Sequence, residues 1–243
     1  MIDLGPIDTC ATHAAEEAPR GVEQAQRTLD WHRARLGHFT GSQVGKLMRE
    51  SRQGGFSDTA MSYVYQVAAT RSMNELVVES DTLFADYLEA TSVETRAMRW
   101  GTEQEDNARR LYARLKGYRV EERGSVEHPT IPYFASSPDG WIADDGRGRS
   151  GCLEIKCPGQ DTYTRYRAEV RDNETLKRVK PDYYWQCQAH MMCSGASWCD
   201  FVAYCPWQAR PIHVVRILPS PGDMDRLEER VRQAEEIIKT LDL

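Results

Sequence analysis

Apolar residues recur at helical spacing in the first half of the chain and at strand spacing in much of the second half. In the first half, helices are expected over 22–36, over 58–76, and from Ser92 or Val93 to Lys116. The longest of these has the clearest apolar stripe, which consists of Ala97, Gly101, Ala108, Leu111, Tyr112 and Leu115. Glycines follow the first and last segments, at positions 37 and 117, as is typical of the residue that ends a helix.

Short segments with alternating apolar residues follow, separated by turn residues. They predict strands at 118–129, 132–145, 150–158, 196–206 and 209–218. Residues 159–180 are basic and are expected to be part helix and part loop, while helices are expected from Pro181 to Gly195 and from Asp223 to the end. This order of elements is typical of an α/β (α+β) fold with a central mixed sheet flanked by helices.

Two regions near the N-terminus have local signals of their own. Thr40 followed by Gln43 fits a capping box, which predicts a short helix beginning there. Residues 1–20 are polar and are expected to be a flexible N-terminal segment, and 21–243 are expected to form a single domain because no linker interrupts them. Residues 77–93 favour neither helix nor strand.

The composition is that of an ordinary globular protein and excludes several other classes. The chain has 243 residues, of which 40% are hydrophobic and 28% charged, unlike a disordered chain, a fibre or a disulfide-rich scaffold. The apolar runs are too short to span a bilayer. The N-terminus lacks the basic and apolar regions of a secretory signal, so a cytoplasmic location is expected.

The net charge of −6 is distributed unevenly. Residues 1–30 carry a net charge of −4 and residues 222–243 a net charge of −3, so the remainder of the chain is close to neutral. Within that remainder, bases outnumber acids by five to two over 31–60 and by nine to five over 146–180. A local basic groove for nucleic acid is therefore compatible with the sequence, whereas a uniformly basic surface is not.

The chain has seven cysteines and no C-x-x-C pair. Four of them are evenly spaced, at intervals of six residues: Cys187, Cys193, Cys199 and Cys205. Free, buried thiols are the favoured interpretation in a reducing compartment. A metal cluster is the less favoured alternative, because zinc and iron–sulfur sites usually use closely spaced pairs.

The most informative stretch runs from Ser-Pro-Asp-Gly at 137–140 to Glu-Ile-Lys at 154–156. Alternation along the strand that contains the second motif places Glu154 and Lys156 on one face and Ile155 on the other. Asp139 ends the preceding strand, across an expected hairpin, so two carboxylates and an ammonium group can converge.

Such a group has the chemistry for hydrolysing a phosphodiester. The two carboxylates and the carbonyl of Ile155 offer the oxygen ligands that a hard divalent cation requires. A cation there can polarise a phosphodiester and lower the pKa of bound water. Lys156 can orient or deprotonate that water, or stabilise developing negative charge. An ordinary surface hairpin with a Glu–Lys pair is the alternative, and the triplet alone does not exclude it.

Two further polar residues bear on this choice. Glu105 lies on the apolar stripe of the long helix, where a carboxylate is costly unless it is paired. Either Arg109, four residues later, neutralises it, or it reaches a metal ion. Gln186, in the helix after Pro181, could hold water or phosphate near such a site, but a polar helix face explains it equally well.

Several motifs in order resemble a known family. PDG followed by LEIK is the pattern of the PD-(D/E)XK nucleases, and its flanks resemble the viral recombinase exonucleases of the phage lambda exonuclease type, including YqaJ-like proteins. The resemblance covers most of the chain, from about residue 25 onward, and GRGRS at 146–150 has the character of an insertion. The supporting motifs are WHRARLGHFTGS (31–42), MSYVY (61–65), WGTEQEDNARRLY (100–112), ASSPDG (135–140), LEIKCP (153–158), YYWQCQ (183–188) and FVAYCP (201–206).

The resemblance implies a PD-(D/E)XK, restriction-endonuclease-like core and a role for each matching residue. Asp139, Glu154 and the carbonyl of Ile155 would hold magnesium, with two ions expected and manganese as a substitute. Glu105 would support the site or its second ion. Lys156 would activate water.

The same resemblance implies how the DNA end is bound. Gln186 would assist the reaction, while Arg35, Ser42 and Ser137 would bind the 5′-terminal phosphate. An arginine fork suits an anion, and Ser42 would sit in the first turn of the predicted helix at Thr40, where free N–H groups suit one too. A solvated helix end is the alternative for Arg35. Met98 would be an apolar wedge that separates the terminal base pair, or else a core residue.

The implied activity is magnesium-dependent 5′→3′ exonuclease digestion of linear double-stranded DNA. It would release 5′-mononucleotides and leave a 3′ overhang for phage-type recombination by strand annealing, in a bacterial or phage-infected cell. The implied partners are double-stranded DNA ends, two further copies in a homotrimeric ring, and a single-strand annealing protein. Two alternatives are a repair or adaptation nuclease with an iron–sulfur cluster and a non-catalytic DNA-end-binding module.

Overall fold

The structure is a computed structural model that describes residues 26–92 and 95–243, so the expected flexible segment 1–20 lies outside it. The helices are α1 (Leu29–Arg33), the 3-10 helix η1 (Val44–Lys46), α2 (Asp58–Arg71), α3 (Glu75–Glu79), α4 (Asp81–Thr91), α5 (Arg96–Lys116), α6 (Gln160–Glu169), α7 (Asn173–Val179), α8 (Pro181–Ser194) and α9 (Pro221–Lys239). The strands are β1 (Phe39–Thr40), β2 (Val126–Glu127), β3 (Phe134–Ser136), β4 (Gly140–Ile142), β5 (Gly151–Lys156), β6 (Cys199–Tyr204) and β7 (Ile212–Ile217).

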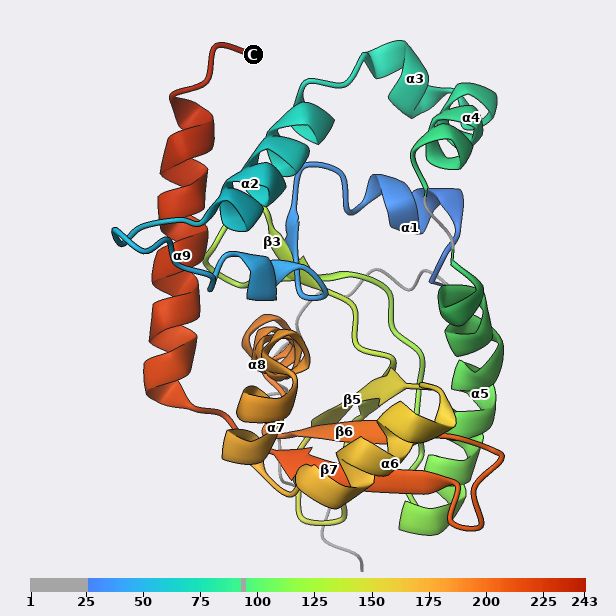
Figure 1. Cartoon of the computed structure of the whole chain (residues 1–243). Helices are drawn as coiled ribbons and strands as arrows, with labels where there is room; N and C mark the ends of the chain where they lie inside the picture. Colours follow the sequence, from blue (N-terminus) through green and yellow to red (C-terminus); the bar gives the residue numbers. More distant parts are fainter. Residues whose placement is uncertain (1–25, 93–94) are drawn as a thin grey trace, which may run out of the picture.

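The predicted mixed α/β class is confirmed, but the described strands form two mixed sheets rather than one central sheet (Figure 1). The smaller sheet has the order β1-β3-β2, with β1 parallel to β3 and β2 antiparallel to it. The larger has the order β4-β5-β6-β7, with β5 parallel to β6 and the other pairs antiparallel. The chain passes from one sheet to the other between β3 and β4, at the Ser-Pro-Asp-Gly motif.

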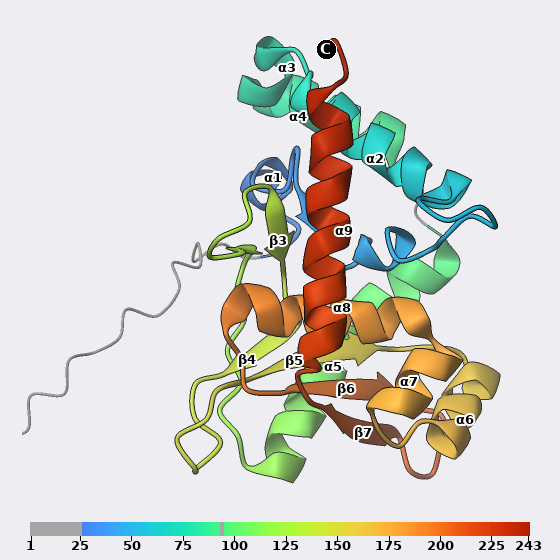
Figure 2. The ribbon, with the colours of Figure 1, turned by 90° about the vertical axis from the view of Figure 1, so that its left-hand side faces the viewer.

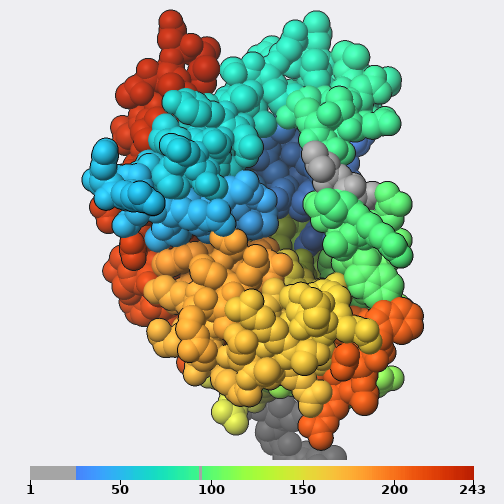
Figure 3. Space-filling model, in the orientation of Figure 1, coloured from blue at the N-terminus to red at the C-terminus, as the bar shows by residue number. Residues whose placement is uncertain are grey.

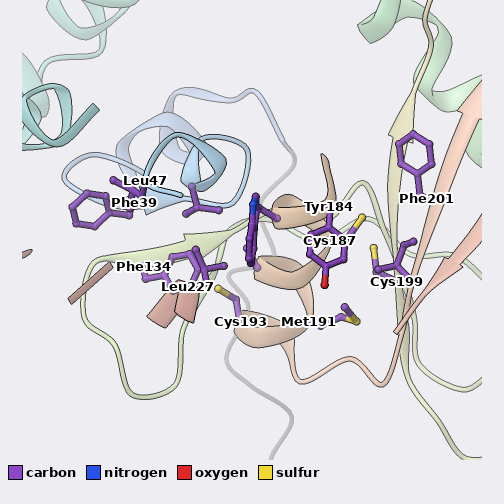
Figure 4. Packing of buried hydrophobic residues seen from close by; sticks show 14 of the residues in the cluster. Phe39, Leu47, Phe134, Tyr184, Cys187, Met191, Cys193, Cys199, Phe201 and Leu227 are labelled. Atoms are coloured by element: carbon purple, nitrogen blue, oxygen red, sulfur yellow. The ribbon is translucent and has the colours of Figure 1, made fainter. Parts of the chain in front are cut away.

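Helix α8 lies between the two sheets (Figure 2). It is buried almost all round, as expected of a helix inside a core. Cys187 faces Cys199 of β6, whereas Cys193 faces Leu227 of α9 and Phe134 of β3 (Figure 4). A single apolar cluster therefore joins both sheets through α8.

Helix α5 covers the other face of the larger sheet. Ala108 and Tyr112 are fully buried against Leu153 and Ile155 of β5. The helix ends at Gly117, whose φ of 69° is left-handed, as predicted. It starts at Arg96 after the capping Thr95, later than predicted, and residues 93–94 lie outside the description. The predicted stripe continues beyond the core, because Ala97 and Gly101 line a surface cleft.

Several local predictions were wrong. The helix expected over 22–36 is only Leu29–Arg33 within the described part, and Thr40 does not cap a helix. Thr40 ends β1 instead, and its N–H donates to the Tyr63 hydroxyl at 2.7 Å. The strand expected at 118–129 is reduced to Val126–Glu127 and a bridge between Glu121 and Trp141. Tertiary partners satisfy these backbone groups in ways that local spacing does not specify.

The two segments whose structure the sequence left open are helical. Residues 77–92 contain the end of α3 and all of α4, and residues 159–180 contain α6 and α7. The six described cysteines are free and buried, as favoured; Cys10 lies outside the description. Residues 146–150, expected to be an insertion, form a turn in which the N–H groups of Gly146 and Gly148 donate to Asp144. No helix in the described residues is long and apolar enough to cross a membrane.

Candidate active site

Asp139 and β5 form the centre of the candidate site. Asp139 immediately precedes β4, and its N–H donates to the carbonyl of Leu153 at 3.0 Å. Its Oδ2 in turn accepts from the N–H of Ile155 at 2.6 Å. The hairpin predicted from the sequence thus places the Asp139 carboxylate beside the strand that carries Glu154 and Lys156. We call Asp139, Glu154 and Lys156 the carboxylate centre.

Glu154 is fully buried and is held by two partners. Its Oε2 lies 2.6 Å from Nε2 of His190 on α8, and its Oε1 faces the ammonium group of Lys156. Burial alone would raise the pKa of Glu154, but Lys156 and His190 outweigh it and hold the pKa below its ordinary value. Glu154 is therefore ionised at neutral pH. His190 contacts Oε2 and Lys156 contacts Oε1, so a cation bound at Glu154 would share the carboxylate with these two groups.

The electrostatics of the other two members differ. Burial raises the pKa of Asp139 well above its ordinary value, and the negative charges of Glu154 and Glu105 raise it further. Burial opposes the charge on Lys156, yet Glu154 and Asp139 raise its pKa above the ordinary value. Lys156 is thus an ammonium group that is paired with Glu154. Of the roles considered for it, orienting water and stabilising negative charge suit this state better than removing a proton.

Glu105 is paired with two arginines, and one of them is Arg109, as one of the two interpretations of the sequence expected. Arg109 donates to its Oε1 at 3.0 Å, and Arg27 donates to its Oε2 at 2.6 Å. Arg109 also donates from Nε to the carbonyl of Asp139 at 2.8 Å. This arginine therefore ties α5 to the loop that carries Asp139, while Glu105 lies on the wall of the adjoining cleft.

Gln186 lies on the face of α8 that covers β5. Tyr183, three residues earlier, has its ring 4.9 Å from the ammonium of Lys156, and His190, four residues later, contacts Glu154. Residues three and four apart share a helix face. Gln186 is buried between them and is thus near the carboxylate centre, as the resemblance implies.

Arg35 and Ser137 form a second group, which we call the Arg35 pocket. Arg35 stacks on the ring of Trp31 at 4.1 Å and donates from Nη1 to Oγ of Ser137 at 3.0 Å. Burial lowers the pKa of Arg35 to about 10, and no carboxylate of the described residues lies within ion-pair distance of it. A desolvated guanidinium without a carboxylate is suited to an external anion.

Ser42 does not lie in the first turn of a helix, contrary to the prediction. It follows β1, which pairs in parallel with β3 with Thr40 opposite Ala135, and it is an exposed residue of the turn that leads to η1. Gly41 lies against Ser136 so closely that a Cβ at this position would clash with its side chain. The chain leaves the strand before Ser42, and a role for Ser42 beside Arg35 stays a prediction.

A cleft of about 510 Å³ opens beside the carboxylate centre. Figure 3 shows the molecule hollowed between α5, in green, and the yellow segment that contains α6. Lys156, Glu105 and Met98 line the cleft. Met98 is 57% exposed, so core filling does not explain it. Its position on the cleft wall is compatible with contact to a ligand.

The residues present fit a magnesium ion. Within the described part of the chain, no three His, Cys, Asp or Glu side chains converge as a complete ligand set. Magnesium needs no such set, since it keeps several waters and binds through one or two carboxylates. Asp139, Glu154 and the carbonyl of Ile155 supply that donor chemistry.

His190 and Ser136 belong to the site but were not predicted from the sequence. Both are buried, and Nδ1 of His190 lies 2.6 Å from Oγ of Ser136. A chain of contacts therefore runs from Ser136 in the smaller sheet through His190 to Glu154 in the larger. The one available signal was weak: His190 follows Gln186 by one helical turn.

Comparisons with known proteins agree with this geometry. The YqaJ-like viral recombinase domain model matches residues 30–197, so the chain belongs to that family. The structure is similar to an alkaline exonuclease (LHK-Exo) from Laribacter hongkongensis, with a TM-score of 0.68 and 29% identity over 87% of this chain and 93% of that one. That enzyme also has a structure in complex with dAMP, with the same values.

A second similarity supports the fold alone. A phage related exonuclease from Haemophilus somnus 129PT has a TM-score of 0.61 and 16% identity over 83% of this chain and 93% of that one. A search of curated protein sequences gave no match. The family and the alkaline exonuclease similarity together indicate a DNA exonuclease with the nuclease fold.

Proposed function

We propose that this protein is a magnesium-dependent 5′→3′ exonuclease that digests one strand of linear double-stranded DNA and leaves a 3′ overhang. The observation that carries the proposal is the carboxylate centre beside the cleft, with Asp139 held to the backbone of Ile155 and Glu154 held between Lys156 and His190. Family membership and the similarity to an alkaline exonuclease support the same activity.

The residues of the centre divide the chemistry. Asp139, Glu154 and the carbonyl of Ile155 would hold magnesium, with a second ion near Glu105, and manganese is expected to substitute. Bound magnesium would polarise the phosphodiester and acidify water. Lys156 would orient the attacking water and stabilise the negative charge that develops on the phosphate. Gln186, on the face of α8 above the strand, would position the same water or phosphate.

The Arg35 pocket would select the 5′ end. A terminal phosphate carries more charge than an internal one, and the guanidinium of Arg35 lacks a carboxylate partner among the described residues. Ser137 already contacts Arg35, and Ser42, in the turn after β1, would complete the site. Only Pro138 separates Ser137 from Asp139, so a phosphate bound here would lie near the carboxylate centre.

Several further features belong to the same proposal. Release of 5′-mononucleotides agrees with the dAMP complex of the related exonuclease. Met98 would act as the wedge that separates the terminal base pair. A homotrimeric ring would enclose the duplex and account for processive digestion, and the 3′ overhang implies a single-strand annealing protein as partner in recombination.

The decisive experiment compares linear duplexes that carry a 5′-phosphate or a 5′-hydroxyl, each with magnesium and with a chelator. We expect mononucleotide release only with magnesium, faster from the phosphorylated end, and no digestion of closed circular duplex. Light scattering should give a mass near three times 27.8 kDa. Binding of DNA ends without any hydrolysis in magnesium or manganese would replace this proposal with a DNA-end-binding module.

A further inference from the structure

A pair of stacked tryptophans lies at the edge of the cleft and has no part in the proposed hydrolysis or in binding of the 5′ end. Trp100 of α5 and Trp207 of the β6–β7 connection have ring centroids 5.9 Å apart and planes inclined by 16°. The connection, orange in Figure 3, meets α5 there. Trp207 is 68% exposed. Packing explains a buried aromatic pair, but it does not explain one that leaves a large ring in solvent.

The surroundings of the pair are hollowed and partly basic. A groove of about 600 Å³ runs between the two rings and the segment 158–160, with Arg96 on its wall. Trp100 and Pro158 line both this groove and the active-site cleft, so the two are continuous. On the other side of Trp100, Arg96 and Arg99 line a further hollow together with one acid, Glu103.

We propose that Trp100, Trp207 and Arg96 bind unpaired nucleotides of the DNA strand that is not digested. The exposed ring of Trp207 would stack on a base, as aromatic side chains do in proteins that bind single strands irrespective of sequence. Arg96 would contact the backbone phosphate. This inference rests on the proposed function and deepens it by assigning a site to the second strand.

The position of the pair favours this ligand. The end of the digested strand is assigned to the Arg35 pocket and the carboxylate centre, so the nucleotide left without a partner there belongs to the other strand. Met98, which would open the base pair, lies two residues before Trp100 on the cleft wall. A base released at Met98 therefore has an aromatic surface and a positive charge next to it.

The test measures binding in a chelator, so that no hydrolysis interferes. Fluorescently labelled duplexes carry a blunt end, a 3′ overhang of thymidines, a 3′ overhang of abasic sites, or a 5′ overhang of thymidines. The abasic overhang keeps the phosphates and removes the bases. Wild type is compared with Trp207→Ala, with Trp207→Phe, and with Tyr65→Ala, which removes an exposed aromatic ring from α2.

We expect wild type to bind the thymidine 3′ overhang more tightly than the abasic one, by roughly fivefold to a hundredfold. Trp207→Ala should lose this preference and bind blunt duplex as before, Trp207→Phe should keep part of it, and Tyr65→Ala should keep all of it. Arg96→Ala should weaken both overhangs equally. A preference that survives in Trp207→Ala, or that wild type shows only for 5′ overhangs, would overturn the assignment.

Two controls separate this inference from its rivals. If Trp207→Ala changes the mass measured by light scattering, the pair is a contact between copies of the chain and the inference is wrong. If wild type fails to hydrolyse phosphorylated duplex in magnesium, the proposed function fails instead, and that result is independent of the overhang comparison made in chelator.

Discussion

The carboxylate centre and the Arg35 pocket lie on either side of Pro138, and they differ in how their charged side chains are paired. In the carboxylate centre, Glu154 is balanced by Lys156 and held by His190, so the protein itself orients the charged groups. In the Arg35 pocket, the guanidinium contacts a ring and a hydroxyl but no carboxylate of the described residues. The charged groups of the first region are paired within the protein, whereas the second, on the proposed function, would receive its counter-charge from a bound phosphate.

This difference has an energetic meaning. A buried charge without a partner costs stability, which binding of an anion recovers. The Arg35 pocket should therefore discriminate between ligands by charge, and the carboxylate centre by the geometry of its oxygens. A substitution in one region should therefore change the property that depends on that region and leave the property of the other region unchanged.

The largest effect is expected in the carboxylate centre. Glu154→Gln keeps the size of the side chain but removes the charge that would hold magnesium. The rate of hydrolysis should therefore fall by more than the roughly hundredfold that is typical when a residue that hydrogen-bonds to a metal ligand is replaced. DNA binding in chelator should persist, because the Arg35 pocket is intact. Glu169→Gln, on the exposed face of α6, is the matched control. Near wild-type turnover of Glu154→Gln in magnesium would show that the centre is wrongly assigned.

Arg35→Ala should act on one kind of DNA end only. Losing a charge-assisted contact costs about 1.5–3 kcal/mol, or about tenfold to a hundredfold in rate. Initial rates on 5′-phosphorylated duplex should fall by that factor, while rates on 5′-hydroxyl duplex should hardly change. Equal slowing of both substrates would make Arg35 a general backbone contact or a structural residue.

His190→Asn should have a smaller effect, which is visible in metal binding. Removing the imidazole frees Oε2 of Glu154 from its partner, and residues that orient metal ligands typically contribute about tenfold or more to metal affinity. The magnesium concentration for half-maximal rate should rise, and calorimetry should show weaker magnesium binding without DNA. Ser136→Ala, one contact further away, should shift the same quantities less. An unchanged magnesium requirement in His190→Asn, with lowered stability alone, would make the chain of contacts merely structural.

The smallest effect concerns stability in chelator. The pKa of Asp139 is raised in the folded protein, so the unfolded chain loses this proton at a lower pH than the folded protein does. The resulting loss of stability begins above the unfolded pKa of about 4 and is complete once the pH exceeds the folded pKa. Asp139→Asn should then raise the melting temperature at neutral pH, by about 2–4 °C for each kcal/mol recovered. Below about pH 4, where the carboxyl is protonated in both states, the difference should vanish. A melting temperature lowered by Asp139→Asn at neutral pH would contradict this.

The sequence predicted those parts of the site that depend on local geometry. Alternation in β5 put Glu154 and Lys156 on one face, and Gly117 and Gly195 end their helices with positive φ as expected. A hairpin is a short-range structure, so the approach of Asp139 to β5 also followed from the spacing.

The rest depends on partners that are distant in the sequence. The N–H of Thr40 donates to Tyr63, which no capping rule anticipates, and His190 meets Glu154 across 36 positions. The division into two sheets follows from the insertion of α8 between them. The spacing of residues within one segment does not predict which distant segment it contacts, because the same segment is compatible with several tertiary partners.

The parallel pairing of Phe39 with Phe134 has a consequence for the order in which the protein is assembled. Parallel strands so distant along the chain close a long loop, whose entropy is lost before the contact stabilises anything. During synthesis, Arg35 and β1 are made long before β3 and Ser137. The hydrogen bond from Arg35 to Ser137 can therefore form only after both of these segments have been made.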